Sequence, residues 1–139
     1  MDNLTIIKRL PYEGKRSAYY ASNYGEILYL RGGALKPIHR RKGVKNKKSI
    51  LRGSGNYQEV NVGRPLYNKL VHRLVAEVFC PNSNTLRNQV DHIDNNPANN
   101  RADNLRWCTC KENHRYAREI RKGERKITNL QRSLFYVKF

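Results

Sequence analysis

An asparagine-rich stretch between two short apolar segments is the feature that most constrains the fold of this chain. Residues 94–104 contain five asparagines and one proline, and the flanking residues 88–93 and 105–108 carry β-forming apolar side chains. This pattern predicts a β-hairpin whose loop is much longer than the usual two to five residues. Asparagine and aspartate suit turns and left-handed backbone positions. Long loops inside compact units are usually functional or packed on themselves, so we expect chemistry or dense hydrogen bonding here.

A helix is expected before the hairpin, over residues 70–79. Its apolar positions recur with helical spacing at Val71, Leu74, Val75 and Val78. Pro81 follows the end of the helix. His72 and Arg73 lie off this stripe, near its polar edge. A catalytic role for His72 is conceivable, but a surface or hydrogen-bonded histidine is the stronger expectation.

A second helix is expected after the hairpin. Thr109 and Glu112 have the spacing of a capping box, and Gly123 is a typical helix end, so the helix should run through Arg121 or Lys122. Asn113 shares the apolar face of this helix, which should pack on the hairpin; the other members of that face are Tyr116, Ala117 and Ile120. His114 is rotated about 100° away, toward Arg118 and Arg121.

The first 66 residues favour β-structure. Residues 17–30 predict two strands about a turn at residues 23–25, and residues 56–62 predict another strand with Tyr57, Glu59 and Asn61 on one side. Four of the nine tyrosines lie in residues 17–30. Stacking on nucleic-acid bases is one interpretation. Packing within a small sheet is favoured over it, because aromatic residues are common strand formers.

The charge balance points to a polyanionic partner. The chain has 28 Lys and Arg against 11 Asp and Glu, a formal net charge of +17, and nucleic acid is the first candidate for such an excess. Residues 36–52 hold eight basic residues and no acid, which predicts a solvated loop or arm. We expect this arm to contact DNA phosphates through Arg40, Arg41, Lys42, Lys45, Lys47 and Lys48.

Other classes of protein are disfavoured by the sequence. No apolar run approaches the roughly 20 residues of a membrane span, and the first residues lack the pattern of a secretory signal. The three cysteines are an odd number without the spacing of a disulfide framework, so a reducing compartment is expected. Cys108 and Cys110 are too close in sequence for a zinc knuckle, and buried or unremarkable thiols are the better interpretation.

Four polar residues stand at informative places in the hairpin and the second helix. Asp91 offers the charged oxygen that a hard divalent cation needs, and Asn113 can add a neutral carbonyl oxygen. His92, when neutral, can take a proton from a water that attacks phosphorus. Asn104 suits a structural role in which its amide ties the loop together and so orients His92.

One geometric tension accompanies this site. Adjacent residues of a strand point to opposite faces, so Asp91 and His92 can share a site only at a strand end or a bulge. The loop that begins at Asp94 makes a strand end reasonable. Each of these residues alone is a weak signal, since an Asp–His pair or an Asn near a helix start is usually structural. Their joint spacing in a strongly basic chain is a strong one.

The same residues resemble a known family. The segments VHRLVAEVF (71–79), VDHIDNN (90–96) and NNRADNLRWCTCKEN (99–113) are similar to the HNH homing endonucleases of phages and mobile introns. The segment YASNYGEI (20–27) resembles, more loosely, the small DNA-binding module often fused before that nuclease unit. The resemblance implies an α+β fold in which a small N-terminal β-rich module precedes a ββα-metal (HNH) nuclease unit and a short basic C-terminal segment.

The resemblance also assigns roles to the site residues. It implies His92 as general base, Asn104 as the central asparagine grouped with it in the catalytic unit, and Asp91 as metal ligand. Asn113 is then the second ligand, in place of the final histidine of the motif, and the cofactor is one divalent ion, Mg²⁺ or Mn²⁺. The 16 residues after Gly123 are too few for the helix-turn-helix module that such enzymes often append.

These inferences give a division of the chain and a set of partners. We expect a DNA-binding module with its basic arm over residues 1–66, the nuclease domain over 67–123, and a basic helix or tail over 124–139. Double-stranded DNA is the expected partner, contacted also by Arg106, His114, Arg118 and Arg121. We expect no membrane, no small-molecule cofactor, a monomer or weak dimer, and a phage- or intron-encoded protein in the host cytoplasm. A DNA- or RNA-binding protein without catalysis remains the alternative.

Overall fold

The computed structural model describes residues 4–14, 17–39, 41–42, 57–62 and 67–123. The elements of this part follow one another in the order β1 (Ile7–Gly14), β2 (Ser17–Ser22), β3 (Ile27–Arg31), β4 (Ala34–Pro37), β5 (Arg41–Lys42), β6 (Gln58–Val62), β7 (Tyr67–Leu70), α2 (Val71–Phe79), β8 (Gln89–His92), the short 3-10 helix η1 (Ala102–Asn104), β9 (Leu105–Cys108) and α3 (Cys110–Arg121). The fold is α+β, as the sequence predicts. No helix of this described part is long and apolar enough to cross a membrane.

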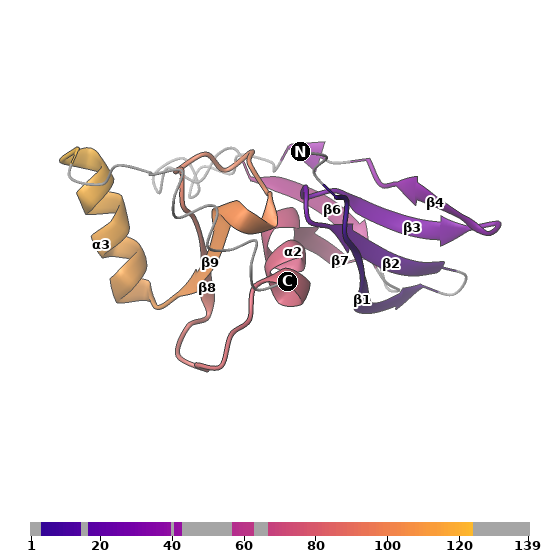
Figure 1. The fold of residues 1–139 in the computed structure, drawn as a ribbon, viewed down its shortest axis with the longest axis horizontal. Coiled ribbons are helices and arrows are strands. Elements are labelled where there is room, and N and C mark those ends of the chain that lie inside the picture. Colours follow the sequence, from indigo (N-terminus) through magenta and orange to yellow (C-terminus); the bar gives the residue numbers. More distant parts are fainter. Residues whose placement is uncertain (1–3, 15–16, 40, 43–56, 63–66, 124–139) are drawn as a thin grey trace.

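The strands form three antiparallel sheets. Their strand orders are β1-β2-β3-β4, β5-β6-β7 and β8-β9. Figure 1 shows the β8–β9 hairpin between α3 on one side and α2 with the N-terminal strands on the other, and α2 and α3 both contact the hairpin. The hairpin therefore has two faces, each covered by a different helix.

The elements around the long loop agree with their sequence signals. β8 and β9 pair regularly from Gln89 opposite Cys108 to His92 opposite Leu105. The capping box at the start of α3 is formed, because the Thr109 hydroxyl accepts from the Glu112 backbone N–H at 3.1 Å and the Glu112 carboxylate accepts from the Thr109 N–H at 2.8 Å. Such a cap stabilises a helix by about 1 kcal/mol.

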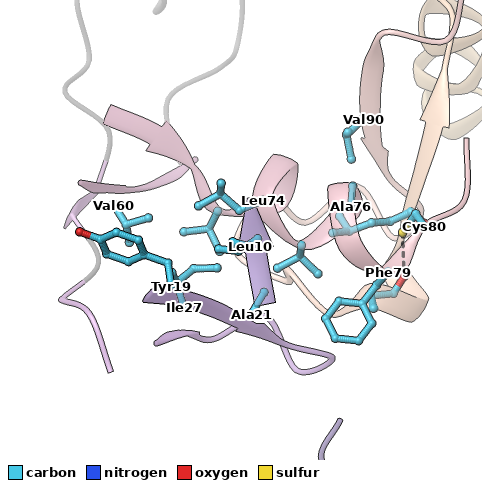
Figure 2. Packing of buried hydrophobic residues seen from close by; sticks show 14 of the residues in the cluster. Leu10, Tyr19, Ala21, Ile27, Val60, Leu74, Ala76, Phe79, Cys80 and Val90 are labelled. Atoms are coloured by element: carbon cyan, nitrogen blue, oxygen red, sulfur yellow. Dashed lines mark hydrogen bonds between the residues drawn. The ribbon is translucent and has the colours of Figure 1, made fainter. Parts of the chain in front are cut away.

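One hydrophobic core joins the N-terminal strands, α2 and the hairpin (Figure 2). Leu74 of α2 lies in the same cluster as Leu10 and Ile27 of the first sheet, Val60 of β6 and Val90 of β8. Burying side chains of this size stabilises the fold by roughly 1.5–3 kcal/mol each. The cluster crosses residue 66, where the sequence suggests a domain boundary, and β7 pairs with β6 across the same point. The three-part division stays a prediction, and it does not coincide with a break in the packing of the described residues.

Two sequence expectations are wrong in part. His72 is not at the surface, since it is only 4% exposed and lies in the first turn of α2 under the rings of Tyr57 and His92. The stretch 36–52 is not loop throughout, because Lys36 and Pro37 end β4 and residues 41–42 form β5. All four residues of β4 are exposed. Because neither face of this strand is buried, its sequence shows no alternation of apolar and polar residues. The remaining residues of that stretch, beyond position 42, lie outside the described residues.

The asparagine-rich loop rests on the turn between β2 and β3. The Ala102 N–H donates to the Asn23 carbonyl at 2.9 Å, and the Asn23 side chain in turn accepts from the Ile6 N–H at 2.9 Å. Gly25 lies in the same turn with φ of +86°, and a Cβ there would lie 2.6 Å from the Asn100 carbonyl oxygen. Only glycine allows this turn and the loop to approach so closely.

Gly25→Ala should therefore lower the free energy of unfolding by about 2–4 kcal/mol, because it combines left-handed backbone strain with a clash against Asn100. Gly32→Ala is the matched control: its φ is +60°, but nothing lies within 4 Å of the added Cβ, so the loss should be about 1 kcal/mol. Urea unfolding followed by the fluorescence of Trp107, the single tryptophan, measures both. Equal losses in the two variants would contradict the close approach.

Candidate functional site

Strand β8 presents Asp91 and His92 on opposite faces of the hairpin. Val90 and His92 are buried on the α2 side, whereas Gln89 and Asp91 are partly buried on the α3 side. His92 ends the strand, as expected, but it still pairs with Leu105, so the alternation continues to the last residue. The structure therefore places the two residues side by side along the chain and directs their side chains apart.

On the α3 face, Asp91 is held by an ion pair. Its Oδ2 accepts from Arg106 Nε at 2.9 Å and from Arg106 Nη2 at 2.7 Å. The guanidinium of Arg106 also lies over the ring of Tyr116, 3.4 Å from its centroid. The Asp91 side chain is only 12% exposed, and a carboxylate so far removed from water requires a compensating cation.

The first turn of α3 adds an amide to this face. Asn113 Nδ2 donates to Gln89 Oε1 at 2.8 Å, so Asn113 points at the hairpin as the helix periodicity predicts. Because the Asn113 side-chain nitrogen donates to Gln89, the side-chain oxygen of Asn113 is the atom suited to bind a cation. His114 is exposed, as are the more distant Arg118 and Arg121, which agrees with a basic face turned away from the hairpin.

These donors fit a hard divalent ion by their chemistry. Carboxylate and amide oxygens are the ligands that Mg²⁺ and Mn²⁺ accept, and Mg²⁺ usually keeps several waters besides one or two protein carboxylates. Among the described residues, no group of three His, Cys, Asp or Glu could hold a metal, and the expected pair Asp91 and Asn113 contains only one residue of those types. Arg106 shows that the position beside Asp91 accepts a positive charge.

On the α2 face, His92 is enclosed by other side chains and is 5% exposed. Its Nε2 lies 3.1 Å from Asn100 Oδ1, and Asn100 Nδ2 donates to Gln58 Oε1 at 2.9 Å. The rings of Tyr57 and His72 pack against it, with centroid distances to His92 of 5.8 and 5.0 Å. This enclosure fixes the direction of the imidazole.

The same enclosure sets the charge of His92. Removal from water lowers its pKa from the ordinary 6.5, and the hydrogen bond with Asn100 and the nearby carboxylates of Asp94 and Asp91 only partly oppose that effect. The imidazole is therefore neutral near pH 7. A neutral imidazole is the form that can accept a proton.

Asn104 closes the loop beside His92. Its Oδ1 accepts from the Asp94 N–H at 3.1 Å, and its Nδ2 donates to Asp94 Oδ1 at 2.8 Å and to the Asn99 carbonyl at 2.9 Å. Burial alone would raise the pKa of Asp94, but hydrogen bonds from Asn99, from the Asn96 backbone and from Asn104 outweigh it and lower the pKa. Asn104 thus ties the two ends of the loop together.

His72 is a further buried group of this region. Burial, with smaller contributions from His92 and Arg73, lowers its pKa from 6.5 to about 3. Its Nδ1 has no hydrogen-bond partner in the part of the chain that the structure describes. The ring is therefore neutral and acts as a packing surface for His92 and Tyr57.

Several expected DNA contacts cannot be placed. Arg40, Lys45, Lys47 and Lys48 lie outside the described residues, and of Arg41 and Lys42 the structure describes only the backbone, in β5. Arg106 is engaged with Asp91 and Tyr116, so its contact with DNA stays a prediction.

Sequence reasoning did not place several residues in the surroundings of His92 and Asn113. These are Tyr57, Gln58, His72, Gln89 and Asn100. Gln58 and Asn100 lie 42 positions apart, and an amide pair at such a separation leaves no local pattern. The alternation of β8 was the available signal for Gln89, because it shares the face of Asp91.

Comparisons with known proteins agree with this architecture. Residues 69–115 match a family model described as HNH endonuclease. Two uncharacterised HNH endonucleases of Acanthamoeba polyphaga mimivirus are similar: one is 36% identical over 91 residues, 65% of this chain and 20% of the relative, and the other 51% identical over 43 residues, 31% of this chain and 13% of the relative.

A solved structure is also similar. It is that of the HNH homing endonuclease I-HmuI, described as binding and cleaving DNA, with a TM-score of 0.62 and 29% identity over 91% of this chain and 64% of that one. The resemblance to HNH homing endonucleases is therefore confirmed, and we refer to residues 69–115, which match the family model, as the HNH unit. The chain spans a fifth or less of the length of the curated relatives it matches.

The buried histidine on α2 makes stability depend on pH. The pKa of His72 is about 3 in the folded protein and near 6.5 when unfolded, so between these values the unfolded state binds more protons. The free energy of unfolding should therefore fall as the pH drops below about 6.5, and this loss should continue toward pH 3. His72→Phe should remove up to about 1.4 kcal/mol per pH unit from that slope. Urea unfolding between pH 7 and 4 measures it.

Exposed His114 provides the control for this prediction. His114→Gln should leave the dependence of stability on pH close to that of the unmodified protein. If His72→Phe and His114→Gln have the same slope as the unmodified protein, His72 is not the buried neutral group described.

Proposed function

We propose that this chain is a metal-dependent endonuclease that hydrolyses phosphodiester bonds of double-stranded DNA. The observation that carries the proposal is the pair Asp91 and His92 at the end of β8, where a partly buried carboxylate and a buried neutral imidazole flank one backbone segment. The match of residues 69–115 to the HNH endonuclease family and the similarity to I-HmuI support it.

His92 is the proposed general base. Its lowered pKa leaves a nitrogen lone pair at neutral pH, which can take the proton of a water as that water attacks phosphorus. Asn104 keeps the loop closed behind it through the bonds to Asp94 and Asn99. Bonds of this kind preserve the direction of a base without contacting the substrate.

Asp91 and Asn113 are the proposed ligands of one divalent ion, Mg²⁺ or Mn²⁺. Such an ion, when bound, supplies positive charge that stabilises the negative charge developing on the phosphate and on the departing 3′ oxygen. Before it binds, Arg106 balances the Asp91 carboxylate. Hydrolysis in this direction gives 5′-phosphate and 3′-hydroxyl ends.

DNA would bind along the basic surfaces. The exposed His114, Arg118 and Arg121 of α3 and the basic residues of the 36–52 stretch can neutralise phosphates, and the net charge of +17 attracts the duplex at long range. One site per monomer cuts one strand, so a monomer or weak dimer should nick DNA first. We expect a phage- or intron-encoded protein that acts in the host cytoplasm; the viral relatives are in keeping with this.

A plasmid nicking assay tests the proposal. The protein should convert supercoiled plasmid to open circle in Mg²⁺ or Mn²⁺, and EDTA should stop the reaction. His92→Ala should slow cleavage by about 10²–10⁴-fold, the usual contribution of a general base, while DNA binding measured by gel shift stays nearly the same. Its unfolding curve confirms that the variant is folded. A protein that shifts DNA or RNA equally well in EDTA and never cuts it would be a binding protein only.

A further inference from the structure

Strand β6, which lies outside the HNH unit of residues 69–115, contributes directly to the surroundings of His92. We propose that Gln58 and Asn100 are positioning residues that hold His92 in its Nε2–H tautomer, with Nδ1 as the proton-accepting nitrogen. The inference rests on the proposed function of His92 as general base. It adds a part of the site that comes from the N-terminal segment.

The direction of the hydrogen bonds determines the tautomer. Asn100 Nδ2 donates to Gln58 Oε1 at 2.9 Å and more weakly to the Ala98 carbonyl at 3.5 Å. The oxygen that faces His92 is therefore Asn100 Oδ1, which has no hydrogen to give. His92 Nε2, 3.1 Å away, must then be the donor. A neutral imidazole has one N–H, so the lone pair lies on Nδ1.

Asn100 is fixed at its backbone as well as at its side chain. It is 3% exposed, and its carbonyl and Cβ lie directly against Gly25 of the β2–β3 turn. The neighbouring backbone is bound to the same turn through the Ala102 N–H and the Asn23 carbonyl. The acceptor of the His92 bond is therefore immobilised from two sides, by β6 and by the first sheet.

The imidazole cannot turn over without losing this bond. A rotation by 180° about χ2 exchanges Nε2 with Cε1, which would place a C–H against Asn100 Oδ1. Tyr57, the residue before Gln58, packs on the His92 ring with an interplanar angle of 31°, and His72 packs edge-on at 64°. Both contacts restrict the ring to its observed plane.

Gln58 is the position at which to test these hydrogen bonds, because it is neither one of the expected metal ligands nor one of the expected DNA contacts. Gln58→Leu removes the acceptor for Asn100 and frees the amide to rotate. Gln58→Glu keeps an oxygen acceptor and should rescue the bond. Asn61→Leu is the matched control: it also replaces an amide side chain by leucine on the same strand, at a residue that takes no part in the hydrogen bond between Gln58 and Asn100.

Long-range ¹H–¹⁵N spectra of the full-length, ¹⁵N-histidine-labelled protein read the tautomer of His92 without DNA. The signals are assigned by their loss in His92→Ala. The unmodified protein and Asn61→Leu should show a protonated Nε2 and an unprotonated Nδ1. Gln58→Leu should show a mixture of tautomers, and Gln58→Glu should restore the original pattern.

Cleavage kinetics of the same variants give the second measurement. Gln58→Leu should lower kcat about 10-fold with KM for the duplex unchanged, and Gln58→Glu should recover most of that loss. A protonated Nδ1 in the unmodified protein overturns the proposal. A Gln58→Leu variant that loses stability but keeps the His92 spectrum and kcat also overturns it, since the amides would then only stabilise the loop. If the unmodified protein never cuts DNA, the nuclease proposal fails. The spectra still decide whether Gln58 and Asn100 hold His92 in one tautomer.

Discussion

The alternation of side chains along β8 is the constraint on which the site depends. Regular pairing with β9 continues to His92, so Asp91 must face α3 and His92 must face α2. Each group consequently has its own surroundings. Asp91 is paired with Arg106 on the face where Asn113 donates to Gln89, whereas His92 contacts aromatic rings and Asn100. One backbone segment thereby supplies a charged oxygen to one face and a neutral imidazole to the other.

The inward direction of His92 links the HNH unit to the segment before it. Tyr57 and Gln58 precede residue 69, yet they contact His92 and Asn100, and Gly25 lies against the Asn100 backbone. The hydrophobic core also joins α2 and the hairpin to the first sheet. The HNH unit and the N-terminal strands are thus packed as one body in the described residues. Substitutions in β6 should therefore alter the hydrogen bonds and packing of His92.

Local signals predicted much of this structure from sequence. The capping box, the stripe of α2 and the two hairpin strands depend on neighbours within four residues, and each is present. Asn113 was oriented correctly for the same reason. The burial of His72 was not predicted, because a polar residue off an apolar stripe is expected at the surface. The residues that cover it, Tyr57 and His92, come from distant segments of the chain. The hydrogen bond between Gln58 and Asn100 was not predicted, because it joins segments 42 positions apart.

The proposed mechanism requires Asp91 and His92 to act on one phosphate, although their side chains leave β8 on opposite faces. Anomalous diffraction from Mn²⁺ in crystals of the His92→Ala protein with an uncut duplex tests it most directly. We expect one Mn²⁺ at the Asp91 carboxylate and the Asn113 carbonyl oxygen, with a DNA phosphate between the ion and the position of residue 92. An ion bound elsewhere, or a phosphate that only the α3 face can reach, would contradict it.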